Sequence, residues 1–477
     1  MRTAYSVETV RAAERELMAR LPEGALMQRA AAGLAAACAD LLGRVYGSRV
    51  VLLVGSGDNG GDALYAGARL ARRGAGVTAV LLARPERTHS EGLTALLRAG
   101  GRVAADGGAE EAVERADLVV DGIVGIGGKG GLRPDAEVLA GAVERSRAAV
   151  VAVDLPSGVE ADTGEVRGAA LRADLTVTFG THKPGLLVDP AREYAGSVRL
   201  VDIGLELPPD ADLEALQHAD VARLLPLPAA ESDKYRRGVV GIAAGSARYP
   251  GAAVLAVSGA LRGGAGAVRY VGPATQAVIA RFPETLVSDQ GPAKAGRVQA
   301  WVVGPGAGDD ATTVAEVLSA EVPVLLDADG LRLAERNAVR GRMAPTLMTP
   351  HAGEAAALLG VPREEVEGAR LASVRELAAV YRATVLLKGS TTLVADSGGG
   401  AVRVNATGTG WLATAGSGDV LSGLAGSLLA AGLSALDAGS VAAYLHGLAG
   451  RFAAAGAPAG AHDVAERIPE AWRDVRG

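Results

Sequence analysis

A lone aspartate stands where a helix is expected to begin, near the end of the chain. In the stretch "TAGSGDVLSG" (Thr414–Gly423), Asp419 follows small residues and precedes an apolar run typical of a helix. Such a carboxylate can simply cap free backbone N–H groups and offset the helix dipole. The same N–H groups can also bind phosphate, and Asp419 would then stand beside that phosphate as a proton acceptor. The rest of the chain has to decide between these two interpretations.

A glycine-rich loop in the first half is a second candidate site. The stretch "VGSGDNGGDAL" (Val54–Leu64) follows an expected strand and opens an expected helix. It matches the dinucleotide-binding pattern at three positions, Gly55, Gly57 and Gly60. However, the next strand ends in Arg84 instead of an acidic ribose ligand, and Asp58 and Asp62 would repel a pyrophosphate. A cation or another binding geometry is therefore expected at this loop.

Polar side chains also follow later strands of the same half. Asp121 lies in "VDGIVGIGGKGG" and Ser157 in "VDLPSGVEADTG", each at the end of an expected strand. Because strand ends at one sheet edge lie together, we expect Asn59, Asp121 and Ser157 within reach of one another. Their amide, carboxylate and hydroxyl oxygens suit a hard cation and not zinc. Each aspartate taken alone could cap a turn, but three such strand ends together favour a site.

The elements that must position these residues follow from the hydrophobic pattern. Apolar strands alternate with helical patterns through the first part, which is typical of a doubly wound parallel sheet. The expected strands span residues 49–55, 76–82, 116–125, 148–158, 173–180 and 197–205. The pattern breaks over residues 206–232, which are rich in proline and charge around one short helical pattern, and we expect the domain boundary there.

Strand alternation restarts after this break. The expected strands span residues 238–246, 266–272, 297–306, 322–330, 344–351 and 383–390. A hairpin with a glycine-rich tip is expected over residues 391–405, and helices over residues 418–460. The sequence therefore predicts two α/β domains, residues 1–215 and residues 228–477.

Composition excludes several classes of protein. The 477 residues are 49% hydrophobic and 21% charged, which is typical of a globular chain. A net charge of −6 and an aromatic content of 3% disfavour a nucleic-acid partner. The single cysteine, Cys38, excludes an internal disulfide framework, and its Ala-rich helical pattern is typical of a core residue. No signal-peptide core and no run of about 18 apolar residues is found, so we expect a cytoplasmic protein without a membrane partner.

The first-half motifs "GDNGGD", "VDGIVGIGGKGG", "AVDLPSG" and "EADTG" resemble the N-terminal epimerase domain of bifunctional NAD(P)H-hydrate repair enzymes. The resemblance implies a potassium ion held by Asn59, Asp121 and Ser157, and an acid–base role for Asp154 at the hydrated nicotinamide. The implied substrate contacts are Asp58, Asn59, Gly60, Gly61, Asp62, Gly125, Ile126, Gly127, Gly128, Lys129, Gly130, Gly131 and Asp154. The family often has an aromatic residue and "GTGL" in the second loop, where this chain reads "GIVGIGGKGG".

The segment "WLATAGSGDVLSGLAGSLLAAG" is similar to the anion hole and catalytic base of the ribokinase-like superfamily. Further motifs, among them "VVGPGAG", "LLDADGL", "LMTPHAGEAAALLG" and "VLLKGSTTLV", narrow the resemblance to ADP/ATP-dependent NAD(P)H-hydrate dehydratases over roughly residues 234–450. The resemblance implies that Asp419 is the catalytic base, and that Mg²⁺ assists the phosphoryl transfer. The implied substrate contacts are Ala252, Gly308, His351 and Asp419. The implied nucleotide contacts are Lys388, Gly389, Ser390, Thr391, Thr392, Gly416, Ser417 and Gly418.

Three residues of these motifs keep a second interpretation. His351 could be a surface residue at a strand end, although "TPHAGE" favours a ligand contact. Asp327 and Asp329 in "DADG" could form a turn or order water around magnesium, and they are not assigned to the catalytic residues.

The sequence thus predicts a Rossmann-like domain followed by a ribokinase-like α/β domain. The chain is expected to epimerise the R and S hydrates, NADHX and NADPHX, and to dehydrate the S form with ADP or ATP as co-substrate. A homo-oligomer is expected. One alternative is a vitamin-type small-molecule kinase fused to a nucleotide-binding module. Another is that the N-terminal domain binds ligand without catalysis.

Overall fold

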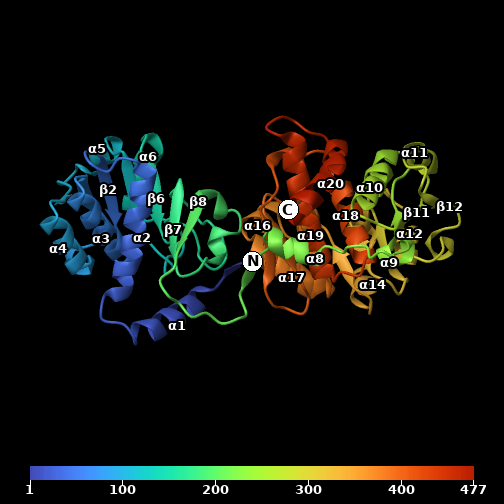
Figure 1. Ribbon diagram of the computed structural model, residues 1–477, viewed down its shortest axis with the longest axis horizontal. Coiled ribbons are helices and arrows are strands. Elements are labelled where there is room, and N and C mark those ends of the chain that lie inside the picture. Colours follow the sequence, from blue (N-terminus) through green and yellow to red (C-terminus); the bar gives the residue numbers. More distant parts are fainter. The chain divides into compact units, whose positions relative to one another are not determined.

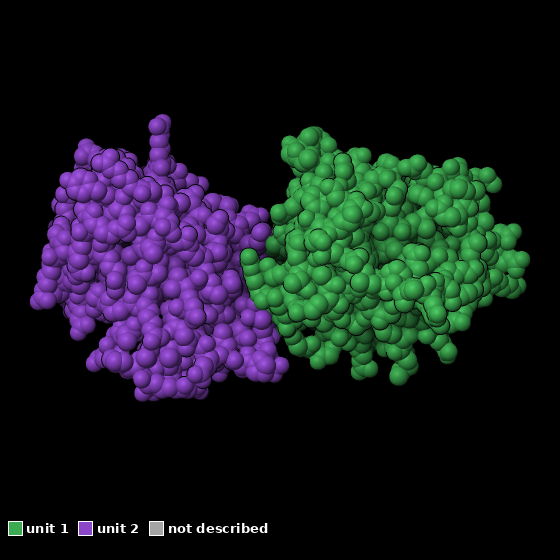
Figure 2. All heavy atoms as spheres, in the orientation of Figure 1, with its two compact units in different colours: residues 1–2, 213–477 green, residues 3–212 purple. Residues whose placement is uncertain are grey.

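The computed structural model describes residues 1–477, apart from the side chain of Pro85 (Figure 1). It divides into two compact units (Figure 2), which we call the N-terminal unit, residues 3–212, and the C-terminal unit, residues 213–477 with residues 1–2. The predicted limits, 1–215 and 228–477, differ from these units by short segments. The stretch expected to hold the boundary contains a helix, where the short helical pattern lies, and a three-residue strand that is too short to produce a hydrophobic period.

The N-terminal unit has a seven-stranded parallel sheet in the order β4-β3-β2-β5-β6-β7-β8. Six of these strands are the predicted ones, and the two-residue β4 is additional. Their bounds are β2 Arg49–Val54, β3 Gly76–Leu81, β4 Arg102–Val103, β5 Leu118–Gly122, β6 Ala149–Val153, β7 Leu175–Phe179 and β8 Ser197–Val201.

Helices cover both faces of this sheet. Alternate residues of β2 belong to different hydrophobic clusters, Leu52 to one with α2, α3 and α4, and Leu53 to one with α5 and α6. The predicted doubly wound arrangement is therefore confirmed. The helices are α1 Val7–Met18, α2 Ala25–Leu42, α3 Asp58–Arg72, α4 Ser90–Arg98, α5 Ala109–Glu114, α6 Pro134–Arg145 and α7 Arg192–Ala195, with the 3₁₀ turns η1 Pro85–Arg87 and η2 Pro184–Leu186.

Helix α2 is the one described helix whose length and composition would allow it to cross a membrane, with a mean hydropathy of 1.2 over 18 residues. In the structure its Leu34 and Cys38 are fully buried in the core of the N-terminal unit. Burial raises the pKa of the Cys38 thiol to about 12, so this cysteine is a small core residue as predicted.

The C-terminal unit is built on a mixed sheet in the order β1-β9-β18-β17-β16-β15-β14-β13-β10-β11-β12. The strands from β10 to β16 run parallel, whereas β17 pairs antiparallel with both β16 and β18, which confirms the predicted hairpin. The bounds are β1 Arg2–Ala4, β9 Leu213–Ala215, β10 Val239–Ala243, β11 Ala267–Val271, β12 Leu286–Ser288, β13 Ala300–Val303, β14 Val324–Leu326, β15 Thr346–Met348, β16 Thr384–Leu387, β17 Thr392–Ala395 and β18 Val402–Asn405.

Helices α8, α10, α18, α19 and α20 share one large hydrophobic core with this sheet. The helices are α8 His218–Leu224, α9 Lys234–Arg237, α10 Pro250–Arg262, α11 Thr275–Arg281, α12 Ala311–Leu318, α13 Asp329–Leu333, α14 Arg336–Arg340, α15 Ala352–Leu359, α16 Arg363–Gly368, α17 Arg370–Tyr381, α18 Ser417–Ala430, α19 Ala435–Ala454 and α20 Ala461–Arg476, with the 3₁₀ turns η3 Pro292–Lys294 and η4 Gly410–Leu412.

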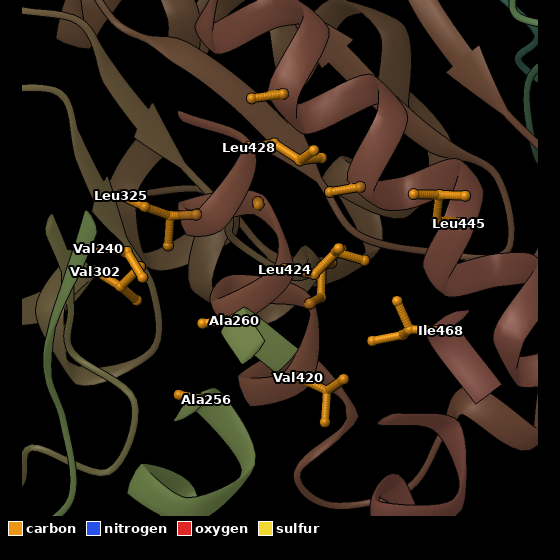
Figure 3. Close-up of a cluster of buried hydrophobic side chains, with 14 of the residues drawn as sticks. Val240, Ala256, Ala260, Val302, Leu325, Val420, Leu424, Leu428, Leu445 and Ile468 are labelled. Carbon is orange, nitrogen blue, oxygen red and sulfur yellow. The ribbon is translucent and has the colours of Figure 1, made fainter. Parts of the chain in front are cut away.

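The small residues of α18 have a packing role. Leu424 points into the core shown in Figure 3, beside Ala256 and Ala260 of α10. A Cβ at Gly423 would lie 1.9 Å from the Ala256 carbonyl oxygen, and one at Gly259 would lie 2.2 Å from the Val420 carbonyl oxygen. Glycine is therefore required on both helices, because their backbones are in direct contact. This contact fixes the position of the start of α18, and therefore the position of Asp419 in its first turn.

Candidate active sites

The candidate site of the N-terminal unit lies where the strand order reverses. Strand β2 has β3 on one side and β5 on the other, so the loops after β2 and β5 leave the sheet on either side of this switch point. Open α/β sheets bind ligands in the crevice at such a point. The first loop leads into α3 at Asp58, and the second carries residues 123–131.

Asp121 and Ser157 are in direct contact at this edge. Ser157 donates its Oγ–H to Asp121 Oδ1 at 2.6 Å and its backbone N–H to Oδ2 at 2.8 Å. Asp121 is fully buried at the end of β5. Burial raises the pKa of its carboxyl to about 6, although the hydrogen bonds from Ser157 and Ile123 oppose the shift. No cation is among the groups that affect this pKa, so a bound positive ion would relieve a real electrostatic cost.

Asn59 lies in the first turn of α3, beside the same strand ends. Its Nδ2 donates to the Val153 carbonyl at 2.5 Å, and a Cβ at Gly125 would lie 2.3 Å from its Oδ1. The structure thus brings Asn59 to the ends of β5 and β6, where Asp121 and Ser157 lie. The side-chain oxygens of Asn59, Asp121 and Ser157 could bind a cation, and together they carry one formal negative charge. The Asn59 amide nitrogen is a hydrogen-bond donor to Val153. No three His, Cys, Asp or Glu side chains gather as a metal site in the described residues.

Asp154 is held by a dense set of donors after β6. It accepts hydrogen bonds from Thr178 Oγ1 at 2.9 Å, the Phe179 N–H at 3.2 Å and Lys183 Nζ at 2.5 Å. Lys183 is 1% exposed and also donates to Thr178 Oγ1 and the Phe179 carbonyl. Asp154 has a φ of 67°, a conformation rare for a residue with a Cβ, and such strain concentrates at functional sites. Sequence reasoning missed Lys183, although its position just after β7 places it at this edge.

Two further carboxyls surround this ion pair. Asp62 is 6% exposed, and its Oδ1 has no hydrogen-bond partner among the described residues. Burial, together with the charges of Asp154, Asp58 and Glu14, raises the Asp62 pKa well above its usual value. Glu14 of α1 also has a raised pKa, mainly through burial, and it feels the charges of Lys183 and Asp154. Glu14 was not predicted, because nothing in the local pattern of α1 distinguishes it.

The predicted contact loops differ in exposure. Gly60 and Gly61 are buried, and a Cβ at Gly60 would lie 2.5 Å from the Gly55 carbonyl oxygen, so these glycines allow α3 to pack closely. In the second loop Ile126 packs against buried core residues. Three residues of that loop face solvent, Gly127, Lys129 and Gly130, and the other four, Gly125, Ile126, Gly128 and Gly131, are partly buried.

In the C-terminal unit, Asp419 stands in the first turn of α18. The helix is preceded by Gly416 in the left-handed conformation, with a φ of 90°, and no side chain caps its N–H groups. Burial, together with the charge of Asp327, raises the Asp419 pKa to about 7, and the charge of Lys388 opposes the shift. A carboxylate with a pKa near neutrality beside uncapped N–H groups has the properties of a general base at an anion site.

A charged network adjoins Asp419. Lys388 Nζ donates to Asp327 Oδ1 at 2.7 Å and lies 3.7 Å from Glu354 Oε2. Ser422 Oγ–H donates to Asp327 Oδ2 at 2.7 Å. Burial lowers the Lys388 pKa, but the charges of Asp327, Glu354 and Asp419 outweigh it, and the Lys388 pKa is raised. Asp327, not assigned by sequence, is thus at the centre of the network.

The predicted hydrate contacts lie on neighbouring loops. Ala252 is in the first turn of α10. A Cβ at Gly306 would lie 2.7 Å from the Ala252 Cβ, so the loop after β13 packs directly against this turn. Gly308 donates its N–H to Asp329 Oδ2 at 2.8 Å. His351 caps α15, because its Nδ1 accepts the Glu354 N–H at 3.1 Å. Its side chain remains 59% exposed, so the cap does not prevent a contact with ligand.

His446 lies behind the start of α18 and was not predicted. It is 6% exposed in α19, and burial lowers the pKa of its ring to about 4, while a hydrogen bond with the Ser417 backbone opposes the shift. A neutral histidine therefore supports the turn that precedes Asp419. His446 lies within α19, outside the sequence motifs, so no local pattern indicated that it would lie near Asp419.

Comparison with known proteins identifies both units. Residues 23–185 match the family described as YjeF-related protein N-terminus, and residues 240–470 match the NAD(P)H-hydrate dehydratase family. The bifunctional NAD(P)H-hydrate repair enzyme Nnr of Mycobacterium leprae (strain TN) is 50% identical over 465 residues, 95% of each chain. The enzyme of the same name from Corynebacterium glutamicum is 36% identical and covers 100% of this chain and 99% of its own.

A solved structure supports the fold of the C-terminal unit. It is the ADP/ATP-dependent NAD(P)H-hydrate dehydratase of Bacillus subtilis, co-crystallised with ATP and Mg²⁺, which superposes with a TM-score of 0.51 at 29% identity. The match covers 55% of this chain and 99% of that one. The family indicated by the motifs is therefore confirmed over almost the whole chain, and the chain belongs to the bifunctional NAD(P)H-hydrate repair enzymes.

Proposed function

We propose that the N-terminal unit interconverts the R and S hydrates of NADH and NADPH, and that the C-terminal unit dehydrates the S hydrate with ADP or ATP as co-substrate. The observation that carries the proposal is Asp419, a half-buried carboxylate with a pKa of about 7 at the uncapped start of α18. The substrates are small molecules, and we place the activity in the cytoplasm, where the reduced nicotinamide pool is used.

In the dehydratase reaction Asp419 accepts the proton of the hydrate's hydroxyl, whose oxygen then takes a phosphoryl group from the nucleotide. The N–H groups of Gly416 and Gly418 and the ammonium of Lys388 face the charge that develops on the phosphoryl oxygens, whereas the Ser417 N–H donates to the Thr414 carbonyl at 3.3 Å and has to leave it to join them. Phosphorylation converts hydroxide, a poor leaving group, into phosphate, and loss of phosphate together with a proton from the neighbouring ring carbon restores the double bond. The residues Lys388–Thr392 bind the nucleotide, and Ala252, Gly308 and His351 bind the hydrate.

The carboxylate oxygens of Asp327 and Asp329 are the kind of ligand that suits Mg²⁺ and its bound water. When bound, Mg²⁺ supplies positive charge to the phosphate oxygens. Asp327 is 1% exposed and already engaged by Lys388 and Ser422, so its role is to hold these two side chains and order the site.

In the epimerase reaction the ring nitrogen expels the protonated hydroxyl from the neighbouring carbon as water. Water then adds to the other face of the resulting iminium and returns a proton to the site. Asp154 gives the first proton to the hydroxyl and takes one back from the water that adds, and Lys183 holds the Asp154 carboxyl in place. Asn59, Asp121 and Ser157 fit a potassium ion, because they offer oxygen donors and a buried carboxylate without a cation among the described residues. When bound, potassium offsets the charge of the carboxyls around the loop.

The experiment is incubation of the whole chain with mixed R and S hydrate, with ADP and with ATP in separate reactions. We expect recovery of the absorbance of reduced nicotinamide together with free phosphate, and with the nucleotide one phosphate shorter. A stable phosphorylated alcohol without recovered absorbance would instead support a vitamin-type kinase. The comparisons favour repair, because relatives at 50% identity over 95% of the chain bear that name.

A further inference from the structure

A buried arginine lies behind the loop that connects β16 to β17. Arg370, the first residue of α17, is 6% exposed. Its NH2 group donates to three carbonyl oxygens, that of Leu387 at the end of β16 at 3.3 Å and those of Lys388 and Thr391 in the loop at 3.1 and 3.0 Å. Helix α17 packs against both β16 and β17, so the guanidinium is carried by a well-supported element.

The loop backbone lies directly on this guanidinium. A Cβ at Gly389 would lie 2.3 Å from Arg370 NH2, so any other residue there would displace the arginine or the loop. In a trans peptide the carbonyl and the following N–H point in opposite directions. Because the Lys388 carbonyl faces Arg370, the Gly389 N–H points away from it, and Gly389 and Ser390 are exposed on that side.

The same loop sends the Lys388 side chain to the charged network beside Asp419, where it meets Asp327 and Glu354. Three carbonyl groups therefore face Arg370 of α17, whereas the Gly389 N–H points away from it and the Lys388 ammonium lies in the charged network beside Asp419. Phosphate groups accept hydrogen bonds from such donors. A loop that lost its contacts with Arg370 would have three carbonyl oxygens to satisfy again, and would turn away from this shape.

We propose that Arg370 is a positioning residue for the nucleotide co-substrate, because it holds the loop Lys388–Thr391 with its donors turned towards the phosphates of ADP or ATP. The inference rests on the proposed nucleotide role of Lys388–Thr392. Arg370 contacts the loop backbone and not Asp419, so its main effect is on the binding of nucleotide. Because Asp327 also holds the Lys388 ammonium, kcat is affected less. All three hydrogen bonds come from the NH2 group at the end of the side chain, so a lysine, which also ends in a charged donor group but has a different length and shape, should replace it only in part.

The test compares Arg370→Ala and Arg370→Lys with Arg375→Ala, which removes an exposed arginine from the same helix. Nucleotide affinity is measured by titration calorimetry without hydrate, and kcat and KM are measured with S hydrate. We expect Arg370→Ala to raise the Kd and KM for nucleotide about 10- to 100-fold, with kcat and the KM for hydrate changed less than about threefold. Arg370→Lys should recover part of the loss, and Arg375→Ala should match the wild type.

Chemical rescue separates positioning from general damage to the fold. Methylguanidinium added to Arg370→Ala should restore nucleotide affinity, whereas the neutral methylurea should not. A folded Arg370→Ala protein that binds nucleotide as well as the wild type would overturn this inference and leave the proposed function standing. Loss confined to kcat, or a failure of both Arg370→Lys and methylguanidinium to improve nucleotide affinity, would also overturn it. A wild-type chain that binds neither ADP nor ATP would overturn the proposed function itself.

Discussion

Asp154 and Asp419 are both proposed to move protons, yet their surroundings are opposite. Asp154 is 5% exposed and receives hydrogen bonds from a hydroxyl, a backbone N–H and the ammonium of Lys183. Asp419 is half-buried at a helix start, and its pKa responds to burial and to the charges of Asp327 and Lys388, with no hydrogen bond among the causes. Hydrogen-bond donors hold the Asp154 carboxylate in place. The Asp419 carboxylate has no hydrogen bond among the causes of its pKa, and its pKa is raised.

The difference follows from the chemistry proposed for each unit. A group that takes and returns the same proton benefits from a fixed position between donors, as Asp154 has. A base that must remove a proton from an alcohol benefits from a pKa near the working pH. Burial and a neighbouring carboxylate produce that pKa at Asp419 without a direct hydrogen bond that would stabilise the ionised form.

The largest effect is expected from Asp419→Asn, which keeps the shape of the side chain and removes its basicity. Dehydration of S hydrate should fall by about 10² to 10⁴, while nucleotide binding and epimerisation stay unchanged. Rates are measured by recovery of reduced nicotinamide, and epimerisation by separating the two hydrates. Dehydration within threefold of the wild type would show that Asp419 is not the base.

The matching change in the other unit is Asp154→Asn, with Lys183→Met as its partner. We expect epimerisation to fall by about 10² or more in each variant, while pure S hydrate is dehydrated at the normal rate. Thr178→Val is a graded control, because it removes one hydrogen bond to Asp154 and leaves the ion pair, so its loss should be smaller. An Asp154→Asn enzyme that still epimerises at the wild-type rate would remove Asp154 from the mechanism.

The pH dependence of dehydration should change in a defined direction. A base with a pKa of about 7 is active above that pH, so kcat should fall as the pH drops through 7. In Asp327→Asn a neighbouring negative charge is lost and Lys388 is released, and both changes lower the Asp419 pKa. The acid limb of the kcat profile should therefore move to lower pH. A limb that stays in place or moves to higher pH would contradict the proposed role of these charges.

The smallest effect concerns potassium in the N-terminal unit. If the ion binds beside Asp121, it stabilises the folded form by mass action, and the melting temperature of that unit should be higher by about 2–5 °C in potassium chloride than in choline chloride. Asp121→Asn should abolish the difference, and Ser157→Ala should reduce it. The measurement is differential scanning calorimetry of the full chain, and equal melting in both salts for the wild type would exclude the site.

The long, strongly apolar strands could be predicted because their hydrophobic pattern is local. The short strands β1, β4, β9 and β12 were missed, since two or three residues have no period. The predicted start of the second domain, residue 228, lies after the start of the C-terminal unit at Leu213 for the same reason. A second domain that starts at residue 228 would leave out Leu216, Val221 and Leu225, which are buried in the core of the C-terminal unit.

Site residues followed the same division. Asp121 and Asp419 could be singled out because one lies at the end of a strand and the other opens a helix, and the structure places them as such. Ser157 lies in a turn four residues after the end of β6, within reach of Asp121. Lys183, Glu14 and Arg370 depend on contacts between segments far apart in sequence, so no local pattern reveals them. Asp327 was visible but ambiguous, because only its contacts with Lys388 and Ser422 separate a turn former from the centre of a network.

The glycine contact between α10 and α18 sets a limit on how this enzyme can change. Gly259 and Gly423 touch no proposed ligand, yet a single methyl group at either position would meet a carbonyl oxygen of the facing helix at about 2 Å. The helices would have to separate, and the start of α18 would move with them. The position of Asp419, the proposed base, therefore depends partly on two glycines that an inspection of the ligand contacts alone would overlook. A laboratory search for altered substrate preference would gain by leaving both glycines untouched.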